Sequence, residues 1–296
     1  MIIGRIHRKF GRGDFPAKSI ILTKSYGRER TIHTNGRQHP LKSKQMKILI
    51  IGESCLDVYQ YGDSHRLCPE APVPVFNSNN LKNTSGGMAR NVYNNMVGIA
   101  PEIEIDLCTN KSWKNITKTR YVDYRTNYIV LRLDENEDLY GNCDLAKFDF
   151  SSYDTVIISD YDKGFLSEDD IADISAIATT TFLDTKKILG SWCKNVDFIK
   201  INDAEYERTK HKLTEDIVNR MIITTGPNGC LYQDKVFPVP KVEIKDTSGA
   251  GDTFIAGLAV EFVRSGEILR AIEFANRCAT RVVQKRGVTA LDEEVK

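Results

Sequence analysis

Short apolar segments alternate with amphipathic segments along most of the chain. Five of them have the length and apolar character of buried strands, namely residues 47–51, 155–159, 181–183, 197–200 and 221–225. Helical spacing follows several of these strands. Ser167 and Asp170 have the spacing of a capping box, and further helices are predicted over about 88–97, 253–264 and 268–285. Strands that alternate with helices predict an α/β fold with a mainly parallel sheet covered by helices.

Two segments interrupt this alternation. Residues 72–76 and 119–133 are rich in Val, Ile and Tyr and have no accompanying helix, so they are predicted to be antiparallel strands. They fit either a small flap that stands off the main sheet or an edge hairpin of the same sheet. Periodicity does not choose between these two arrangements.

The first 45 residues differ from the rest in charge. They hold eleven basic and two acidic side chains, a net of +9, whereas the remainder holds 30 basic and 38 acidic side chains, a net of −8. The segment is either a nucleic-acid-binding or targeting tail, a disordered extension, or a stretch that precedes the true start at Met46. We therefore place the folded domain at 46–296, and its acidic balance gives no reason to expect nucleic-acid binding there.

Cysteine usage and hydropathy limit the remaining classes. The seven cysteines are dispersed and form no Cys-x-x-Cys pair, which predicts reduced thiols in a cytoplasmic protein and argues against a zinc site. The longest apolar runs, such as 48–51, are too short to cross a bilayer, and residues 1–45 lack the apolar core of a secretory signal.

The densest chemical motif is Asp246-Thr-Ser-Gly-Ala-Gly-Asp252, which follows the strand-like residues 242–245 and precedes a predicted helix. Backbone N–H groups of Gly249, Ala250 and Gly251 at a helix start form an anion site, which suits a phosphoryl group in transfer. Asp252 in the first turn can take the proton of an attacking hydroxyl. The structural alternative is a tight turn with Asp252 as a helix cap. The motif is not a Walker A loop, because no Lys-Ser/Thr follows the glycines.

This run, together with Gly86-Gly87-Met-Ala89-Arg-Asn91, resembles the two signatures of the ribokinase-like (pfkB) carbohydrate kinases. The resemblance implies a three-layer α/β/α kinase domain with a small β lid, formed by strands at about 59–76 and 119–133. It makes Asp252 the catalytic base and gives the anion hole to Gly249, Ala250 and Gly251. It also implies use of ATP and Mg²⁺, with a monovalent cation such as K⁺ as a further candidate.

The same resemblance assigns a nucleotide side to the site. Asn202 and Glu205 would handle magnesium and the phosphates, with Glu205 as the candidate magnesium ligand. The structural alternative for this pair is a helix cap. The other residues implied to bind the nucleotide are Thr225, Gly226, Gly229, Asp246, Thr247 and Asn276.

Within the family, the chain most resembles kinases of D-glycero-D-manno-heptose 7-phosphate, the kinase half of bifunctional kinase/adenylyltransferases. The matching stretches are 52–62, 68–75, 117–120, 131–134, 159–164 and 184–186. The implied substrate-binding residues are Asp57, Gly86, Gly87, Asn91, Arg132, Asp160 and Lys163. Two features depart from this branch: a shorter segment between 97 and 117, and Arg90 at a position that is usually small.

The expected activity is phosphorylation of the heptose phosphate at its anomeric hydroxyl, in a homodimer formed through the lid. No nucleic-acid or membrane partner is expected for the folded domain. One alternative is a kinase of another sugar, sugar phosphate or nucleoside. A second alternative, from another class, is a non-catalytic sugar- or nucleotide-binding regulator.

Overall fold

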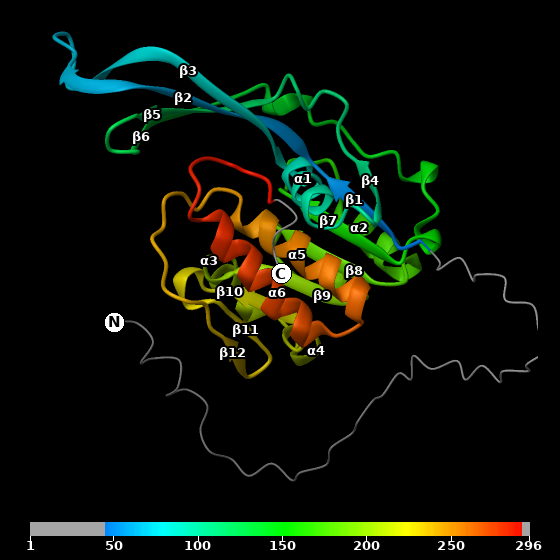
Figure 1. Ribbon diagram of the computed structural model, residues 1–296. Helices are drawn as coiled ribbons and strands as arrows, with labels where there is room; N and C mark the ends of the chain where they lie inside the picture. Colours follow the sequence, from blue (N-terminus) through cyan, green and yellow to red (C-terminus); the bar gives the residue numbers. More distant parts are fainter. Residues whose placement is uncertain (1–44, 292–296) are drawn as a thin grey trace, which may run out of the picture. The chain divides into compact units, whose positions relative to one another are not determined.

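The computed structural model describes residues 45–291, and the predictions for residues 1–44 lie outside this range (Figure 1). Its larger sheet has the strand order β12-β11-β10-β9-β8-β7-β1-β4. The strands are β1 (Lys47–Gly52), β4 (Glu104–Cys108), β7 (Thr155–Asp160), β8 (Thr181–Thr185), β9 (Phe198–Asn202), β10 (Met221–Thr224), β11 (Cys230–Tyr232) and β12 (Lys235–Phe237). The six strands from β10 to β4 pair in parallel, and β11 and β12 add an antiparallel edge.

Strand β1 shows why this sheet is covered on both faces. Ile48 and Ile50 are fully buried on one face, in a cluster with residues of α1 (Ala89–Ile99), α5 (Ala250–Ser265) and α6 (Ile268–Val282). Leu49 and Ile51 are fully buried on the other face, in a cluster with residues of α2 (Glu168–Ile177). Two short helices, α3 (Asp203–Thr209) and α4 (Glu215–Val218), follow β9. A run that is apolar at every position is the signature of a parallel strand between two helical layers, so the predicted three-layer α/β fold is confirmed.

The second sheet, which we call the lid, has four strands in the order β3-β2-β5-β6 (Figure 1). They are β2 (Ser54–Leu67), β3 (Pro74–Met88), β5 (Thr117–Asp123) and β6 (Ile129–Glu135). The structure therefore selects the separate flap over an edge hairpin of the main sheet. Only Glu53 separates β1 from β2, so the first strand of the lid continues directly from β1 of the main sheet.

Local signals in the sequence fix several helix ends. Ser167 caps α2 in the predicted capping box with Asp170. Helix α5 begins after Gly249, which has a positive φ of 79°, and ends before Gly266, whose φ is 72°. Both positions favour glycine because an L side chain is strained there.

Two local predictions need correction. Residues 242–245 are not a strand: they follow Pro238 and Pro240 and pair with no strand, and the Lys245 N–H donates instead to the Val283 carbonyl at 2.8 Å. Gly86 and Gly87 do not open a helix either; they end β3, and α1 begins at Ala89. The segment between 97 and 117 contains only the strand β4, in agreement with its short length.

None of the helices in the described part of the chain is both long and apolar enough to span a bilayer.

Candidate active site

Asp252 lies buried in the first turn of α5, where its two carboxylate oxygens have different donors. The Asn91 side-chain amide donates to Oδ2 at 2.9 Å, and the Tyr161 hydroxyl donates to Oδ1 at 2.7 Å. Asn91 belongs to α1 and Tyr161 follows β7, so three separate elements meet at this carboxylate. The structure thus joins the two sequence signatures through a hydrogen bond.

The side-chain orientation of Asn91 is fixed by hydrogen bonds from Asn95, which lies one helical turn further along α1. The Asn95 amide donates to the Asn91 carbonyl at 2.8 Å and to its Oδ1 at 3.1 Å, while Thr253 donates to Asn95 Oδ1 at 3.2 Å. Because Asn91 Oδ1 accepts from Asn95, its NH₂ group must face Asp252. This network turns a donor toward the carboxylate.

Burial raises the pKa of Asp252 to about 6, although the hydrogen bonds from Asn91 and Tyr161 act in the opposite direction. A carboxylate with a pKa just below neutrality is ionised at pH 7 and still basic enough to accept a proton from an alcohol as it attacks. Asp252 is therefore ionised near neutral pH and has the basicity that a general base needs.

The glycines before Asp252 form the predicted helix start. Among the described residues, the N–H groups of Gly249, Gly251 and Asp252 donate no hydrogen bond to a loop or cap carbonyl, in contrast to that of Thr253, which donates to the Gly249 carbonyl at 2.9 Å. The Ala250 N–H differs, since it donates to the Thr247 carbonyl at 3.2 Å. A side chain at Gly249 would meet Asn91 Nδ2 at 2.6 Å, so only glycine leaves the amide in place beside Asp252.

A buried lysine contributes positive charge at the same helix start. A Cβ atom on Gly251 would lie 2.8 Å from Lys200 Nζ, so the ammonium rests against the backbone of the glycine. Lys200 donates to Asp184 Oδ2 at 2.7 Å, whereas Asp184 Oδ1 is buried without a hydrogen-bond partner in the described structure. An unpaired buried carboxylate oxygen is costly unless a ligand or water completes it.

In the lid, Asp57 of β2 pairs with Arg120 of β5. The Arg120 guanidinium donates to Asp57 Oδ1 at 2.5 Å, and both side chains are largely buried. A side chain at Gly87 would meet Asp57 Oδ2 at 2.1 Å, so this glycine lets the carboxylate lie against the backbone of β3. Three of the predicted substrate-binding residues, Asp57, Gly87 and Asn91, are therefore near one another.

The remaining predicted substrate residues take different positions. Arg132 is half-exposed on β6 and pairs with Asp134 at 2.8 Å, and Lys163 pairs with Glu137 at 3.1 Å. Asp160 is fully buried and bound by the Thr185 hydroxyl and by Lys187, and burial raises its pKa to about 6. Its carboxylate supports the loop after β7 rather than facing Asp252.

Asn202 and Glu205 form a helix cap, which was the structural alternative predicted for this pair. Each side chain accepts a hydrogen bond from the other residue's backbone N–H at 2.8 Å, which completes a capping box at the start of α3. The second oxygen of Glu205 pairs with Lys186. Among residues 45–291, no group of three or more His, Cys, Asp and Glu side chains is arranged to hold a metal ion.

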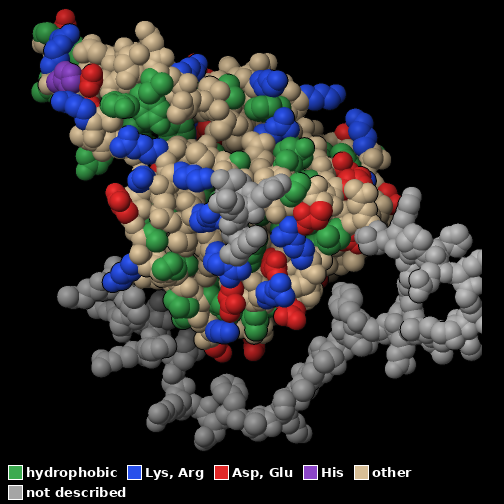
Figure 2. All heavy atoms as spheres, in the orientation of Figure 1, with side chains coloured by type: hydrophobic (Ala, Val, Ile, Leu, Met, Phe, Trp, Pro, Cys, Tyr) green, Lys and Arg blue, Asp and Glu red, His purple; other side chains and the backbone are tan. Residues whose placement is uncertain are grey.

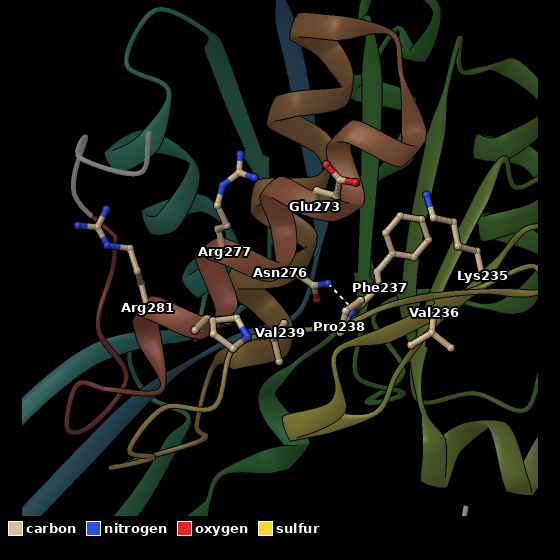
Figure 3. Close-up of a pocket in the computed structure, with 11 residues that line it drawn as sticks. Lys235, Val236, Phe237, Pro238, Val239, Glu273, Asn276, Arg277 and Arg281 are labelled. Carbon is tan, nitrogen blue, oxygen red and sulfur yellow. Dashed lines mark hydrogen bonds between the residues drawn. The ribbon is translucent and has the colours of Figure 1, made fainter.

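A pocket of about 630 Å³ lies between α6 and the segment that follows β12 (Figure 3). Glu273, Asn276 and Arg277 line its α6 wall, and Phe237 and Pro238 line the other. The Asn276 amide donates to the Phe237 carbonyl at 2.9 Å and joins the two walls. The predicted nucleotide residue Asn276 therefore lines this pocket.

The predicted nucleotide loop lies beside this pocket. Thr225 donates to the Gly229 carbonyl through both its N–H, at 2.8 Å, and its hydroxyl, at 3.0 Å. Gly226 and Gly229 both have positive φ, and a side chain at Gly229 would meet the Phe237 carbonyl at 2.0 Å. Close packing of this turn on Phe237 places it next to the pocket wall.

Asp246 and Thr247 lie at a second, smaller hollow of about 270 Å³, which lid residues Tyr59, Val122 and Ile129 also line. Asp246 accepts from the N–H groups of Ser248, at 2.8 Å, and Gly287, at 3.0 Å. Asp246 therefore stabilises the loop that leads into α5 through these two hydrogen bonds.

Sequence reasoning missed several residues that complete the site. Tyr161, Arg120 and Lys200 contact Asp252, Asp57 and Gly251 directly, and Glu53 accepts from the N–H groups of Tyr161 and Lys163 at 2.8 and 3.0 Å. Glu53 and Tyr161 directly follow β1 and β7, which is where open α/β sheets place ligands, whereas Arg120 and Lys200 lie inside β5 and β9. That rule was a signal for Glu53 and Tyr161 but not for Arg120 or Lys200.

Comparison with known proteins places this arrangement in a family. The sequence profile described as pfkB family carbohydrate kinase matches residues 102–295. The bifunctional protein HldE of Helicobacter acinonychis is 30% identical over 81% of this chain and 63% of its own length. HldE of Campylobacter jejuni subsp. jejuni is 30% identical over 86% of this chain and 65% of its own. The chain thus spans less than two thirds of the length of these relatives.

Solved structures show the same fold. Ribokinase from Thermotoga maritima superimposes with a TM-score of 0.64 at 17% identity, covering 84% of this chain and 98% of that one. Arabidopsis thaliana ribokinase, solved with ribose and ATP, gives a TM-score of 0.60 at 14% identity, covering 85% and 97%. The fold is therefore ribokinase-like, as predicted. Because the profile matches more than half of its length, the chain belongs to the pfkB family of carbohydrate kinases.

Proposed function

We propose that the protein transfers the γ-phosphoryl group of ATP to the anomeric hydroxyl of D-glycero-D-manno-heptose 7-phosphate. The observation that carries the proposal is the position of Asp252. It is a buried carboxylate of raised pKa, held by Asn91 and Tyr161 in the first turn of α5, directly after Gly249-Ala-Gly251. Such an arrangement suits a proton acceptor beside a phosphoryl group in transfer.

In this proposal Asp252 orients the acceptor hydroxyl and takes its proton as the oxygen attacks phosphorus. The N–H groups of Gly249 and Gly251 then bind the equatorial oxygens, where negative charge accumulates in the transition state. Lys200, which rests against Gly251, adds a full positive charge at the same place. The pocket at Asn276 is proposed to receive the nucleotide base.

The residues present also fit a magnesium ion carried in with the nucleotide. Asp184 has a buried oxygen without a hydrogen-bond partner in the described structure, and Glu205 is a second carboxylate near Lys186, which also interacts with Asp184. Mg²⁺ keeps most of its waters and needs only one or two carboxylates from the protein. Asp184 and Glu205 would hold the hydrated ion, which would neutralise charge on the phosphates. A monovalent cation such as K⁺ remains a proposed further cofactor.

A phosphorylated sugar is favoured over a neutral one by the charges beneath the lid. Lys118 pairs with Asp134 at 3.2 Å and with Glu137 at 2.7 Å, and Lys163 also pairs with Glu137. Together with Arg132 and the Arg120–Asp57 pair, this group holds four basic and three acidic side chains. Arg132 and Lys163 are the more exposed cations of this group and suit a substrate phosphate, while Asp57 can accept hydrogen bonds from sugar hydroxyls.

The test is ADP release by the purified protein with ATP, Mg²⁺ and a panel of acceptors. Heptose 7-phosphate should give the highest kcat/KM among heptose 7-phosphate, ribose, fructose, fructose 6-phosphate and a nucleoside. Higher kcat/KM for any other acceptor would replace heptose phosphate with that acceptor. Absence of sugar-dependent turnover with every acceptor would favour the non-catalytic regulator.

The apolar outer surface of the lid supports a homodimer formed through it. Hydrophobic side chains gather on the visible face of the lid (Figure 2). Leu131 and Leu133 of β6 are 56% and 41% exposed, and their register partners on β5 are Tyr121 and Thr119. Leucines on the solvent face of a sheet favour a second apolar surface as partner, and a second copy of the lid offers one.

A further inference from the structure

Two cysteines lie in contact at the edge of the main sheet, away from Asp252. Cys108 is the last residue of β4, and Cys143 lies in the connection from β6 to β7. Their Sγ atoms are 3.1 Å apart, although 35 positions separate them in the sequence. The Cys143 N–H donates to the Phe165 carbonyl at 3.0 Å, and Cys108 pairs with Ile51 of β1, so both backbones are anchored.

These two thiols differ from most other cysteines of the chain in their accessibility. Cys55, Cys193, Cys230 and Cys278 are buried, whereas Cys108 and Cys143 are half-buried and open to small solutes. Cys68 is also half-buried, but it lies beside Glu70 at the far end of β2 and β3 and contacts no cysteine. Cys108 and Cys143 are therefore the pair placed for reaction with each other.

The two sulfur atoms are unequal in acidity. The neighbouring Cys143 thiol lowers the pKa of Cys108, and the Lys147 ammonium lowers it further, although burial opposes both. The same contact, together with burial, raises the pKa of Cys143. The 3.1 Å contact allows either sulfur to resolve an oxidised form of the other, and the lowered pKa of Cys108 favours Cys108 as the attacking thiolate.

We propose that Cys108 and Cys143 form a reversible disulfide when the protein meets a hydroperoxide. The Cys108 thiolate attacks the peroxide O–O bond, which yields a sulfenic acid on Cys108 and releases hydroxide or alkoxide. The Cys143 sulfur then attacks the sulfenic sulfur, so that the S–S bond forms and the sulfenic hydroxyl leaves with the thiol proton as water. A dithiol returns both residues to thiols.

The bond would fix the path by which the chain returns from the lid to the core. Between Glu135 of β6 and Thr155 of β7, this return segment carries Glu137, which binds Lys118 and Lys163, and Tyr140, which contacts Met88. Tethering Cys143 to β4 closes a loop of 35 positions and joins the segment to the edge of the main sheet. Oxidation would thus tie the base of the lid to the core.

The experiment treats the full-length protein with substoichiometric hydrogen peroxide and maps tryptic peptides under non-reducing conditions. Wild type and the matched control Cys68→Ser should both give a linked peptide pair that contains Cys108 and Cys143 and that dithiothreitol separates. Cys108→Ser and Cys143→Ser should each lack it. With dimedone present, Cys143→Ser should carry the adduct on Cys108, whereas Cys108→Ser should carry none on Cys143.

Oxidised wild type should also unfold at a higher Tm than the reduced form, a difference that Cys143→Ser should lose. Wild type in which Cys68 is oxidised while Cys108 and Cys143 stay unlinked would overturn the proposal. A dimedone adduct on Cys143 in Cys108→Ser would overturn the assigned order of attack. None of these measurements requires kinase activity, so their outcome is independent of the proposed substrate.

Discussion

Asp252 combines two requirements that normally conflict. A carboxylate that removes a proton must be ionised, yet this one is buried, and burial alone favours the neutral acid. One donor on each oxygen, from Asn91 and Tyr161, stabilises the ion without introducing a cation that would abolish its basicity. The pKa of about 6 results from this balance.

Replacing Asp252 by Asn should separate catalysis from stability. Turnover should fall roughly 10³-fold because the base is lost. The fold should persist, since an Asn at this position can accept from Asn91 and donate to the Tyr161 oxygen. Nucleotide binding, measured by calorimetry, should survive. Full activity in this variant would remove Asp252 from its proposed role.

The same variant should be more stable than wild type at pH 7.5. The folded pKa of Asp252 is about 6 against 3.8 for an exposed Asp, so the native state binds more protons between these values. Wild type therefore loses stability as pH rises through this window, by about 3 kcal/mol at most, and the variant does not. Urea unfolding at pH 7.5 and pH 5 should show the gain shrinking at the lower pH. An equal gain at both would contradict the assigned pKa.

Tyr161→Phe should move the pH dependence of catalysis. The Tyr161 hydroxyl lowers the pKa of Asp252, so its loss should raise the acid limb of the kcat/KM profile by roughly one pH unit. Tyr140→Phe is the matched control, because that buried hydroxyl contacts only the Met88 sulfur in the described structure. Equal shifts in both variants would show that the change is structural and does not act through Asp252.

At the scale of elements, the lid offers a test of phosphate recognition. Arg132 is half-exposed on β6 and opposite Arg120 in the β5–β6 register, so both point to the same face of the lid. Arg132→Met should raise KM for a phosphorylated sugar about tenfold and leave kcat nearly unchanged, since the contact is to a non-reacting phosphate. Its control is Arg125→Met, an exposed arginine in the β5–β6 turn. A similar change in KM in both variants would exclude a specific role for Arg132.

The elements themselves were largely predictable because each carries a local signal. Apolar runs defined β1, β7, β8, β9 and β10, and the Ser167 box defined the start of α2. Residues 242–245 were wrongly predicted to be a strand. A short run that contains Val and Ile has the same local pattern whether it pairs with a neighbouring strand or not. The choice between flap and edge hairpin depended on the pairing of β2 with β5, which no local pattern encodes.

The site was predictable where a motif names its residues, and not where residues pair across the fold. The sequence identified Asp252 and Asn91, and the structure joins them across 161 positions. Nothing local indicates that Arg120 meets Asp57 or that Lys200 lies against Gly251. These contacts arise because elements distant in the sequence are neighbours in the fold: β2 pairs with β5, and Lys200 of β9 lies against the start of α5.

For the whole molecule, the lid surface predicts the oligomeric state. Leu131→Glu combined with Leu133→Glu should convert a dimer into a monomer, because burying two carboxylates in an apolar interface is costly. Light scattering coupled to gel filtration measures the mass. Ile177→Glu is the control, since Ile177 is 56% exposed on α2, outside the lid. A wild-type monomer at micromolar concentration would exclude the lid dimer.

The long β2–β3 hairpin also makes the lid a lever. Its base is the Ser54–Met88 pair, next to Asn91, and its far end is the Leu67–Pro74 pair. Strands of this length extend roughly 45 Å, so a rotation of about 5° at the base displaces the far end by roughly 4 Å. Cys68 lies at that far end, and a fluorophore on it, in a chain that lacks Cys108 and Cys143, would report an ångström-scale adjustment around the sugar as an amplified signal.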